Sequence, residues 1–340
     1  MSLPKAEVRR LFKRRVTRIF LVITLIGLAI FPIAFTINSH ANSPESRAAA
    51  QAQADQAYQQ ATVEFQRTLA ECEAAKARGE TGLDERYGPN CGADWGPRPE
   101  YYPAEQYLPY EFNFQDEFAP SLAVLSAILA LVAFVVGASF VGAEWNSGGM
   151  MNLLLWRPRR IPVLLTRLGV LLGSMLGLTV VLGAAWTAAF WAIGRYDGNL
   201  GKLTSGVWQS LGLTGARGVT MVLLAATVGF CLASIGRHTA MALGVGIGAV
   251  VVSEIGLRIA FELLQVRYGD RYVLSTYLVA WFDKKLTITD WRACDFVQGP
   301  VACTPPEYVV TWQHASVLLA TVLVLSVFGA LWSIRRRDVA

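Results

Sequence analysis

The segment A-E-W-N-S-G-G-M-M-N-L-L-L-W-R-P-R-R, residues 143–160, lies between two long apolar runs. Its apolar residues, Met150, Met151 and 153–156, are too few to cross a bilayer, which takes about 20 residues. They are also too apolar for a loop left in water. The segment therefore predicts a short helix at a membrane face, with a contact surface that another molecule covers.

The composition indicates that lipid is the solvent of much of the chain. Its 340 residues are 54% hydrophobic and 16% charged, whereas charged residues make up about 25% of a soluble domain. A net charge of +5 can indicate a nucleic-acid partner, but such a partner needs one clustered basic patch, and here the charges segregate by loop. We expect no nucleic acid.

Apolar runs predict an all-α polytopic membrane protein with six transmembrane helices. The first run is longer than the core of a secretory signal, which has about 7 to 15 residues, so we expect a retained anchor. The predicted spans are residues 19–37, 120–142, 163–194, 218–235, 239–257 and 314–334.

Residues 1–18 carry seven cations and one acid, with Val8, Leu11 and Phe12 on one helical face. This pattern predicts an amphipathic helix on the inner membrane surface. A disordered basic tail is the alternative.

The remaining segments are polar connections. Residues 38–119 open with an alanine and glutamine tract, which predicts one long helix capped by Ser43 or Ser46. An irregular loop packed back on that helix should follow, and together they form an α-helical extracytoplasmic insertion. Residues 258–313 contain an apolar piece, 273–282, that is too short to cross and suggests a re-entrant segment. The other connections are an inner segment, 143–162, an outer loop, 195–217, and a tail, 335–340.

The charges predict that both termini are cytoplasmic. One face collects residues 1–18, 143–167, 236–239 and the C-terminal tail, with 15 of the 30 lysines and arginines and only three acids. Basic loops stay in the cytoplasm, so this face is the inner one. The alanine, arginine and glycine usage suggests a bacterial plasma membrane.

Four cysteines fall outside the membrane in this topology, where disulfides form. We predict Cys72 with Cys91 and Cys294 with Cys303, because each pair closes a short local loop. Pairing between the two outer regions remains the alternative, since sequence does not fix connectivity. Cys231 lies within a span.

The sequence holds no recognisable catalytic or metal-binding motif. G-x-x-x-x-G-K-[ST] is absent, so this chain does not hydrolyse nucleotide by that route. H-E-x-x-H and G-x-S-x-G are absent as well. No Cys and His cluster has metal-ligand spacing. We therefore predict no catalytic residue, no metal and no enzyme activity in this chain.

Glycines recur at intervals of four within two spans, and such ridges let helices approach closely. A subunit interface, a translocation seam or packing within one subunit would each explain them. The glycines are Gly169, Gly173 and Gly177 on the third span, and Gly244 and Gly248 on the fifth.

Three charges lie inside or near the ends of spans. Glu254 is a functional candidate because intramembrane acids usually are. Pairing with Arg258, one helical turn later, is the structural alternative. Arg167 is expected to extend its side chain to the inner surface.

The inner segment has an acid, a glycine four residues on, two leucines and R-P-x-R leading into the next span. This order resembles the cytoplasmic coupling segment of type-two ABC exporter permeases; an ordinary basic loop is the alternative. The six spans, the basic N-terminal helix and the polar return before the last span resemble the same family over almost the whole chain. The insertion 38–119 departs from the family's minimal form. By this resemblance, the residues that contact an ATPase subunit are Glu144, Trp145, Gly148, Gly149, Met151, Leu154, Arg157, Pro158 and Arg160.

The resemblance implies a homodimer bound to two cytoplasmic ATPase chains, with ATP and Mg²⁺ in those partners and no cofactor in this chain. The largely apolar spans favour export of an amphipathic or hydrophobic cargo such as a drug, a peptide or a lipid. One alternative is a membrane sensor or immunity protein that binds a ligand through its outer domain. A secondary transporter is another, supported only by Glu254.

Overall fold

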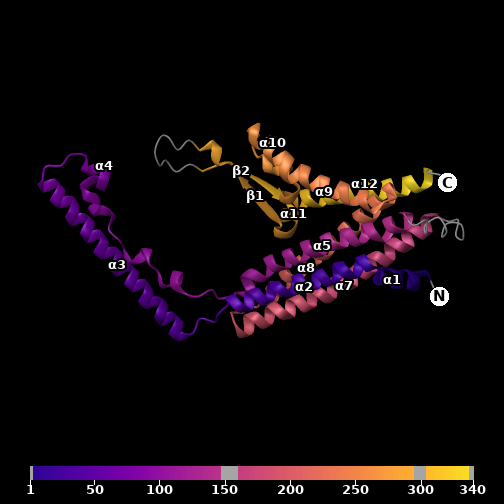
Figure 1. Ribbon diagram of the computed structural model, residues 1–340, viewed down its shortest axis with the longest axis horizontal. Coiled ribbons are helices and arrows are strands. Elements are labelled where there is room, and N and C mark those ends of the chain that lie inside the picture. The colour runs from indigo at the N-terminus through magenta and orange to yellow at the C-terminus, as the bar shows by residue number, and fades with distance from the viewer. Residues whose placement is uncertain (1–2, 147–159, 295–303, 337–340) are drawn as a thin grey trace. The chain divides into compact units, whose positions relative to one another are not determined.

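The computed structural model describes residues 3–146, 160–294 and 304–336 (Figure 1). Within these residues, six helices are long and apolar enough to cross a membrane, which confirms the predicted all-α polytopic class. They are α2 (Arg15–Asn38), α5 (Phe114–Asn146), α7 (Arg160–Tyr196), α8 (Ser205–Gly236), α9 (Thr239–Val250) with its continuation, and α12 (Trp312–Arg336).

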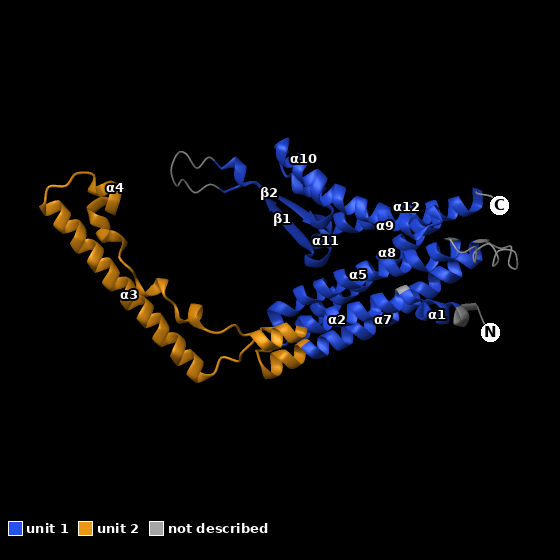
Figure 2. Ribbon diagram, viewed as in Figure 1, with its two compact units in different colours: residues 1–31, 115–189, 202–340 blue, residues 32–114, 190–201 orange. Residues whose placement is uncertain are grey.

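The chain divides into two compact units (Figure 2). The first comprises residues 1–31, 115–189 and 202–340, and therefore most of each span. The second comprises residues 32–114 and 190–201.

The first unit begins with α1 (Leu3–Lys13), which ends just before α2. Leu11 of its predicted apolar face is fully buried, while Val8 and Phe12 are partly exposed. A helix therefore forms over Leu3–Lys13, within the predicted segment 1–18, and its amphipathic role at the membrane surface stays a prediction.

Close helix packing joins α5 to α8. A Cβ at Gly137 would clash with the carbonyl oxygen of Ala226, and a Cβ at Gly229 with that of Phe134. Glycine at these two positions lets the backbones meet. α9 and α12 also pack against α8.

Two helices begin well before their apolar runs. α5 starts at Phe114, before Pro120, and α8 starts at Ser205 rather than at Gly218. The Thr204 hydroxyl caps α8 by accepting a hydrogen bond from the Val207 amide at 3.4 Å. Hydropathy marks only the part of a helix that suits hydrocarbon, so it misses polar ends that capping holds.

After α9 the helix continues through a π-helical turn, Val251–Leu257, into α10 (Arg258–Leu263). The short apolar piece then forms α11 (Leu274–Asp283), which packs against α12. An antiparallel hairpin follows, β1 (Lys285–Thr289) with β2 (Glu307–Thr311), and the sequence analysis did not anticipate it.

The second unit contains the outer insertion. α3 (Pro44–Ala77) begins at an N-cap formed by Ser43, one of the two predicted caps, whose side chain accepts a hydrogen bond from the Ser46 amide. α4 (Leu83–Tyr87) and the 3₁₀ turns Pro89–Trp95 and Ala104–Tyr107 pack back on α3. The long helix with a returning loop agrees with the prediction.

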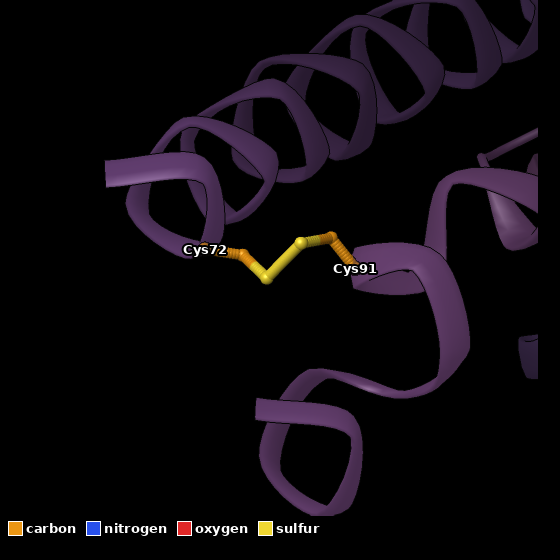
Figure 3. The surroundings of a disulfide bond; sticks show 2 residues. All are labelled: Cys72 and Cys91. Atoms are coloured by element: carbon orange, nitrogen blue, oxygen red, sulfur yellow. A yellow bond between two sulfur atoms is a disulfide. The ribbon is translucent and has the colours of Figure 1, made fainter. Parts of the chain in front are cut away.

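Cys72 and Cys91 form the predicted disulfide between α3 and the returning loop, with their Cα atoms 5.9 Å apart (Figure 3). Cys294 is also disulfide-bonded. Cys303 lies outside the described residues, so the second pairing stays a prediction. Cys231 is a free, buried thiol.

A hydrogen-bonded junction ties three helix ends together in the second unit. Ser39, just after α2, donates its hydroxyl to the Asp197 carbonyl at 2.6 Å and accepts from the Phe112 amide at 2.9 Å. The rings of Phe35, Phe112 and Phe190 pack beside it, with centroids 5.3 to 5.5 Å apart.

Candidate coupling site

Glu144, the first of the residues predicted to contact an ATPase, lies in the last turn of α5. Its side chain is only 12% exposed. Arg14 binds one carboxylate oxygen through Nη2 at 2.7 Å, and Arg167 binds the other through Nη1. The carboxylate is therefore held by two cations from other elements.

Arg167, on α7, is the central cation of this arrangement. Its side chain is 1% exposed, and its Nη2 lies 3.2 Å from Oε1 of the fully buried Glu7. The expectation that Arg167 extends to the inner surface stays a prediction; the structure pairs its side chain with Glu7 and Glu144. A guanidinium inside a low-dielectric region needs carboxylate partners, and Glu7 and Glu144 provide them.

Arg14 lies between α1 and α2 and contacts α5 in three ways. Besides Glu144, it donates through Nη1 to the Ser139 carbonyl at 2.7 Å, and its guanidinium lies 5.3 Å from the Phe140 ring centroid. Burial lowers the pKa of Arg14, and the Glu144 carboxylate opposes that effect by favouring the charged form. Arginine stays protonated at neutral pH in either case.

We call Glu7, Arg10, Arg14, Glu144 and Arg167 the charge cluster. Arg10 belongs to it because its Nη1 lies 3.3 Å from Glu7 Oε1, although Arg10 itself is largely exposed. The cluster joins α1, the end of α5 and the beginning of α7. Sequence reasoning missed the roles of Glu7 and Arg14, although a single acid among seven cations was a usable signal for Glu7.

Trp145, the next predicted contact residue, faces another inner connection. The guanidinium of Arg237, in the turn between α8 and α9, lies 4.9 Å from the Trp145 ring centroid. Nearby, a Cβ at Gly142 would come within 2.5 Å of the Thr239 amide nitrogen. The ends of α5, α8 and α9 therefore meet closely.

No side-chain contacts are described for the other residues predicted to contact the ATPase. Arg160 is the first residue of α7. Six lie outside the described residues: Gly148, Gly149, Met151, Leu154, Arg157 and Pro158.

Glu254 and its neighbour Ser253 cap another helix. The Ser253 hydroxyl accepts a hydrogen bond from the Leu274 amide at 2.7 Å, and Glu254 Oε1 accepts from the Ser275 amide at 2.7 Å. Both amides belong to the first turn of α11, where a helix has no acceptors of its own. Arg258 lies 4.0 Å from Glu254 and 3.5 Å from Asp270. These contacts favour the structural interpretation of the Glu254 and Arg258 pair.

The glycine ridges behave differently from the glycines between α5 and α8. A Cβ at any ridge glycine would meet no atom within 4 Å in the described part of the chain. Nearby side chains on α9, such as Val245 and Ile247, are exposed. The ridges therefore make no close helix contact among the described residues. They are Gly169, Gly173, Gly177, Gly244 and Gly248.

Among residues 3–146, 160–294 and 304–336, no group of three His, Cys, Asp or Glu side chains has a geometry that could hold a metal ion.

Comparison with known families gives one match. The sequence model of the family described as ABC-2 family transporter protein matches residues 1–339. No curated protein and no solved structure matches the chain significantly.

Proposed function

The chain belongs to the ABC-2 family of transporter proteins, and on this premise we propose that it forms a homodimer that exports an amphipathic or hydrophobic cargo. As a permease of this family, it is the membrane transport component, and the ATPase is a separate subunit. In the proposed complex ATP and Mg²⁺ bind to that subunit. The complex has two copies of each chain and lies in a bacterial plasma membrane with both termini of this chain in the cytoplasm.

The charge cluster is the observation that carries the coupling part of this proposal. The segment 147–159 leaves the end of α5 and enters the beginning of α7. Arg14 and Arg167 hold Glu144 at the first junction, and Arg167 itself lies in the second turn of α7. A displacement of the segment by an ATPase would therefore move α5, α7 and α1 together.

In this scheme Glu144 acts as a positioning residue rather than as a direct contact to the ATPase, because its carboxylate is engaged within the chain. The direct contacts would come from the segment that follows it, including Met151, Leu154 and Arg157. ATP-driven closure of the ATPase pair would press on both copies of the segment and switch the paired spans between inward-open and outward-open states.

The glycine ridges support the dimer. Gly244 and Gly248 lie among exposed apolar side chains on α9, and the described chain places nothing against them. Small residues at such a surface permit close approach of a helix from a second copy.

Purification in mild detergent followed by an ATPase assay tests coupling. We expect a nucleotide-binding subunit to co-purify with the wild-type protein. Glu144→Gln should leave the complex assembled but lower the stimulated ATP turnover of that subunit about tenfold or more. A tenfold loss corresponds to about 1.4 kcal/mol of coupling free energy between the two subunits. Glu71→Gln, on the exposed face of α3, is the matched control and should leave turnover unchanged.

Two results would overturn the proposal. If intact protein brings down no ATPase, the exporter function fails, and a sensor that uses the outer unit to bind a ligand becomes the better explanation. If an ATPase co-purifies but Glu144→Gln leaves its turnover unchanged, the charge cluster has no part in coupling.

A further inference from the structure

A cavity of about 260 Å³ lies between α5, α7 and α8 in the first unit. Its lining contains no charged side chain. Each helix contributes, for example through Leu125 and Leu129 of α5, Gly183 of α7, and Leu211 and Gly215 of α8. On α5 and α7, the two lining helices that carry cluster residues, the lining is at least 12 residues from Glu144 and Arg167, so the proposed coupling site does not account for the cavity.

The hydroxyl groups of the lining are already engaged within their own helices. Ser126 donates to the Leu122 carbonyl at 2.7 Å, Thr179 to the Met175 carbonyl at 2.8 Å, and Thr187 to the Gly183 carbonyl at 2.8 Å. A polar group entering the cavity would therefore lose hydrogen bonds to water and gain no donor from these hydroxyls, which is costly. The cavity suits an apolar occupant.

The length of the cavity matches half a bilayer. Its lining on α8 runs from Trp208 to Val219, which at 1.5 Å per residue is about 17 Å. Half of a hydrocarbon core of about 30 Å is about 15 Å. Trp208 lies close to the start of α8 at Ser205, and tryptophan is enriched where membrane meets water. The lining residues 122–129 of α5 and 179–187 of α7 lie within the predicted spans 120–142 and 163–194, so this part of the cavity reaches the hydrocarbon, whereas the α8 lining up to Gly215 precedes the predicted span 218–235.

Glycines make one side of the cavity a slot. A Cβ at Gly183, Gly212 or Gly215 would meet no atom within 4 Å in the described chain. The slot is bounded by α5 and α7 as well as by the glycines of α8, so its occupant must be narrow and flexible. A single hydrocarbon chain is narrow enough.

We propose that this cavity holds one acyl chain of a membrane phospholipid from the leaflet nearest the start of α8. The chain lies along the slot formed by the three glycines, with the headgroup beside Trp208. The proposal is independent of ATPase coupling and needs neither the charge cluster nor a second copy of the protein.

Photolabelling in vesicles tests this directly. The full-length protein is reconstituted with phosphatidylglycerol that carries a diazirine in the middle of one acyl chain, and labelled residues are mapped by mass spectrometry. We expect labels to concentrate on the cavity lining of α5, α7 and α8. Gly212→Leu and Gly215→Leu should each reduce that labelling roughly tenfold, because a leucine side chain overfills the slot. Gly206→Leu, on the same helix but outside the lining, is the control and should label as the wild type does.

The wild-type map decides the proposal even if a variant fails to fold. Labels spread evenly over exposed apolar positions such as Ile247 and Val324 would overturn it. Unchanged cavity labelling in both leucine variants would also overturn it. Labelling of the cavity by a diazirine fatty acid but not by the phospholipid would show that the occupant is not a membrane phospholipid.

Discussion

The guanidinium of Arg167 forms an ion pair with the carboxylate of Glu7, 160 residues earlier in the chain, at an Nη2 to Oε1 distance of 3.2 Å. Both side chains are almost completely buried. Arg167 also binds Glu144, so one cation holds two acids from different helices. These ion pairs explain why an arginine is buried within a predicted span.

Replacing Arg167 should destabilise the protein strongly. Arg167→Met leaves Glu7 and Glu144 with less positive charge in a buried site, and breaking a buried pair costs about 3 to 5 kcal/mol. Arg167→Lys should rescue only part of this, because an ammonium does not bridge two carboxylates as a guanidinium fork does. Chemical unfolding in detergent micelles measures the loss.

The matched control is Arg67→Met on α3, where the pair with Glu71 is exposed. Its effect should stay below about 1 kcal/mol. Equal stability of Arg167→Met and the wild type would contradict the importance of the buried pair.

The Arg14 and Glu144 pair should show measurable coupling in a double-mutant cycle. With Arg14→Met and Glu144→Gln, we expect an interaction energy of about 1 to 3 kcal/mol, as found for contacting residues in one network. The exposed Arg78 and Glu80 pair has a similar distance, 2.9 Å against 2.7 Å. The interaction energy of this exposed pair should be less than about 1 kcal/mol. If the interaction energy of Arg14 and Glu144 is no larger, burial does not strengthen their pairing.

Loss of the disulfide should loosen the outer unit. The bond between Cys72 and Cys91 closes a loop of 19 residues, and crosslinks of this loop length contribute about 3 kcal/mol. Cys72→Ser and Cys91→Ser should each accelerate proteolysis of the returning loop to the same extent, and the double variant should add little. Rapid thiol labelling of Cys72 in the untreated wild-type protein would contradict the presence of the bond.

The caps provided by Ser253 and Glu254 should protect the first turn of α11. Ser253→Ala and Glu254→Ala each remove an acceptor, and losing a helix cap costs about 1 kcal/mol. Hydrogen exchange at the Leu274 and Ser275 amides should therefore accelerate roughly fivefold. Glu262→Ala, which removes an exposed partner of Arg292, should leave these amides unchanged; equal acceleration in that variant would indicate general loosening instead.

Two kinds of glycine should respond oppositely to alanine. Gly229→Ala pushes a Cβ into the Phe134 carbonyl and should destabilise the α5 and α8 packing by about 1 to 3 kcal/mol. Gly169→Ala adds a Cβ where the described chain has open space and should be neutral within about 1 kcal/mol. Comparing the two unfolding free energies tests this, and an inverted order would contradict the described packing.

Sequence patterns predicted those parts of the fold that depend on local chemistry. The length of the apolar runs was enough to predict six spans. The alanine and glutamine tract, with Ser43 before it, was enough to predict α3 and its N-cap. The pairing of Cys72 with Cys91 followed from their separation. In each case the deciding residues are neighbours along the chain.

The features that sequence missed depend on distant partners. Glu7 looked like an isolated acid in a basic tail because Arg167 comes close only after α1 and α7 have packed. The cap of α11 comes from Ser253, 21 residues away from Leu274. The β hairpin pairs Leu286 with Val310, and neither five-residue strand carries a strong pattern alone.

The π-helical turn Val251–Leu257 changes the direction in which later side chains project. A π turn is an α-helix with one residue inserted, and each residue of an α-helix advances the phase by about 100°. Arg258, the first residue of α10, therefore projects about 100° away from the direction that an uninterrupted helix would give it, and there it meets Asp270. Deleting one residue of the turn would convert it to an ordinary α-helical turn and leave α10 in its present phase, so Arg258 would still meet Asp270. The π turn is therefore how the helix takes up one extra residue without turning α10 away from its partner.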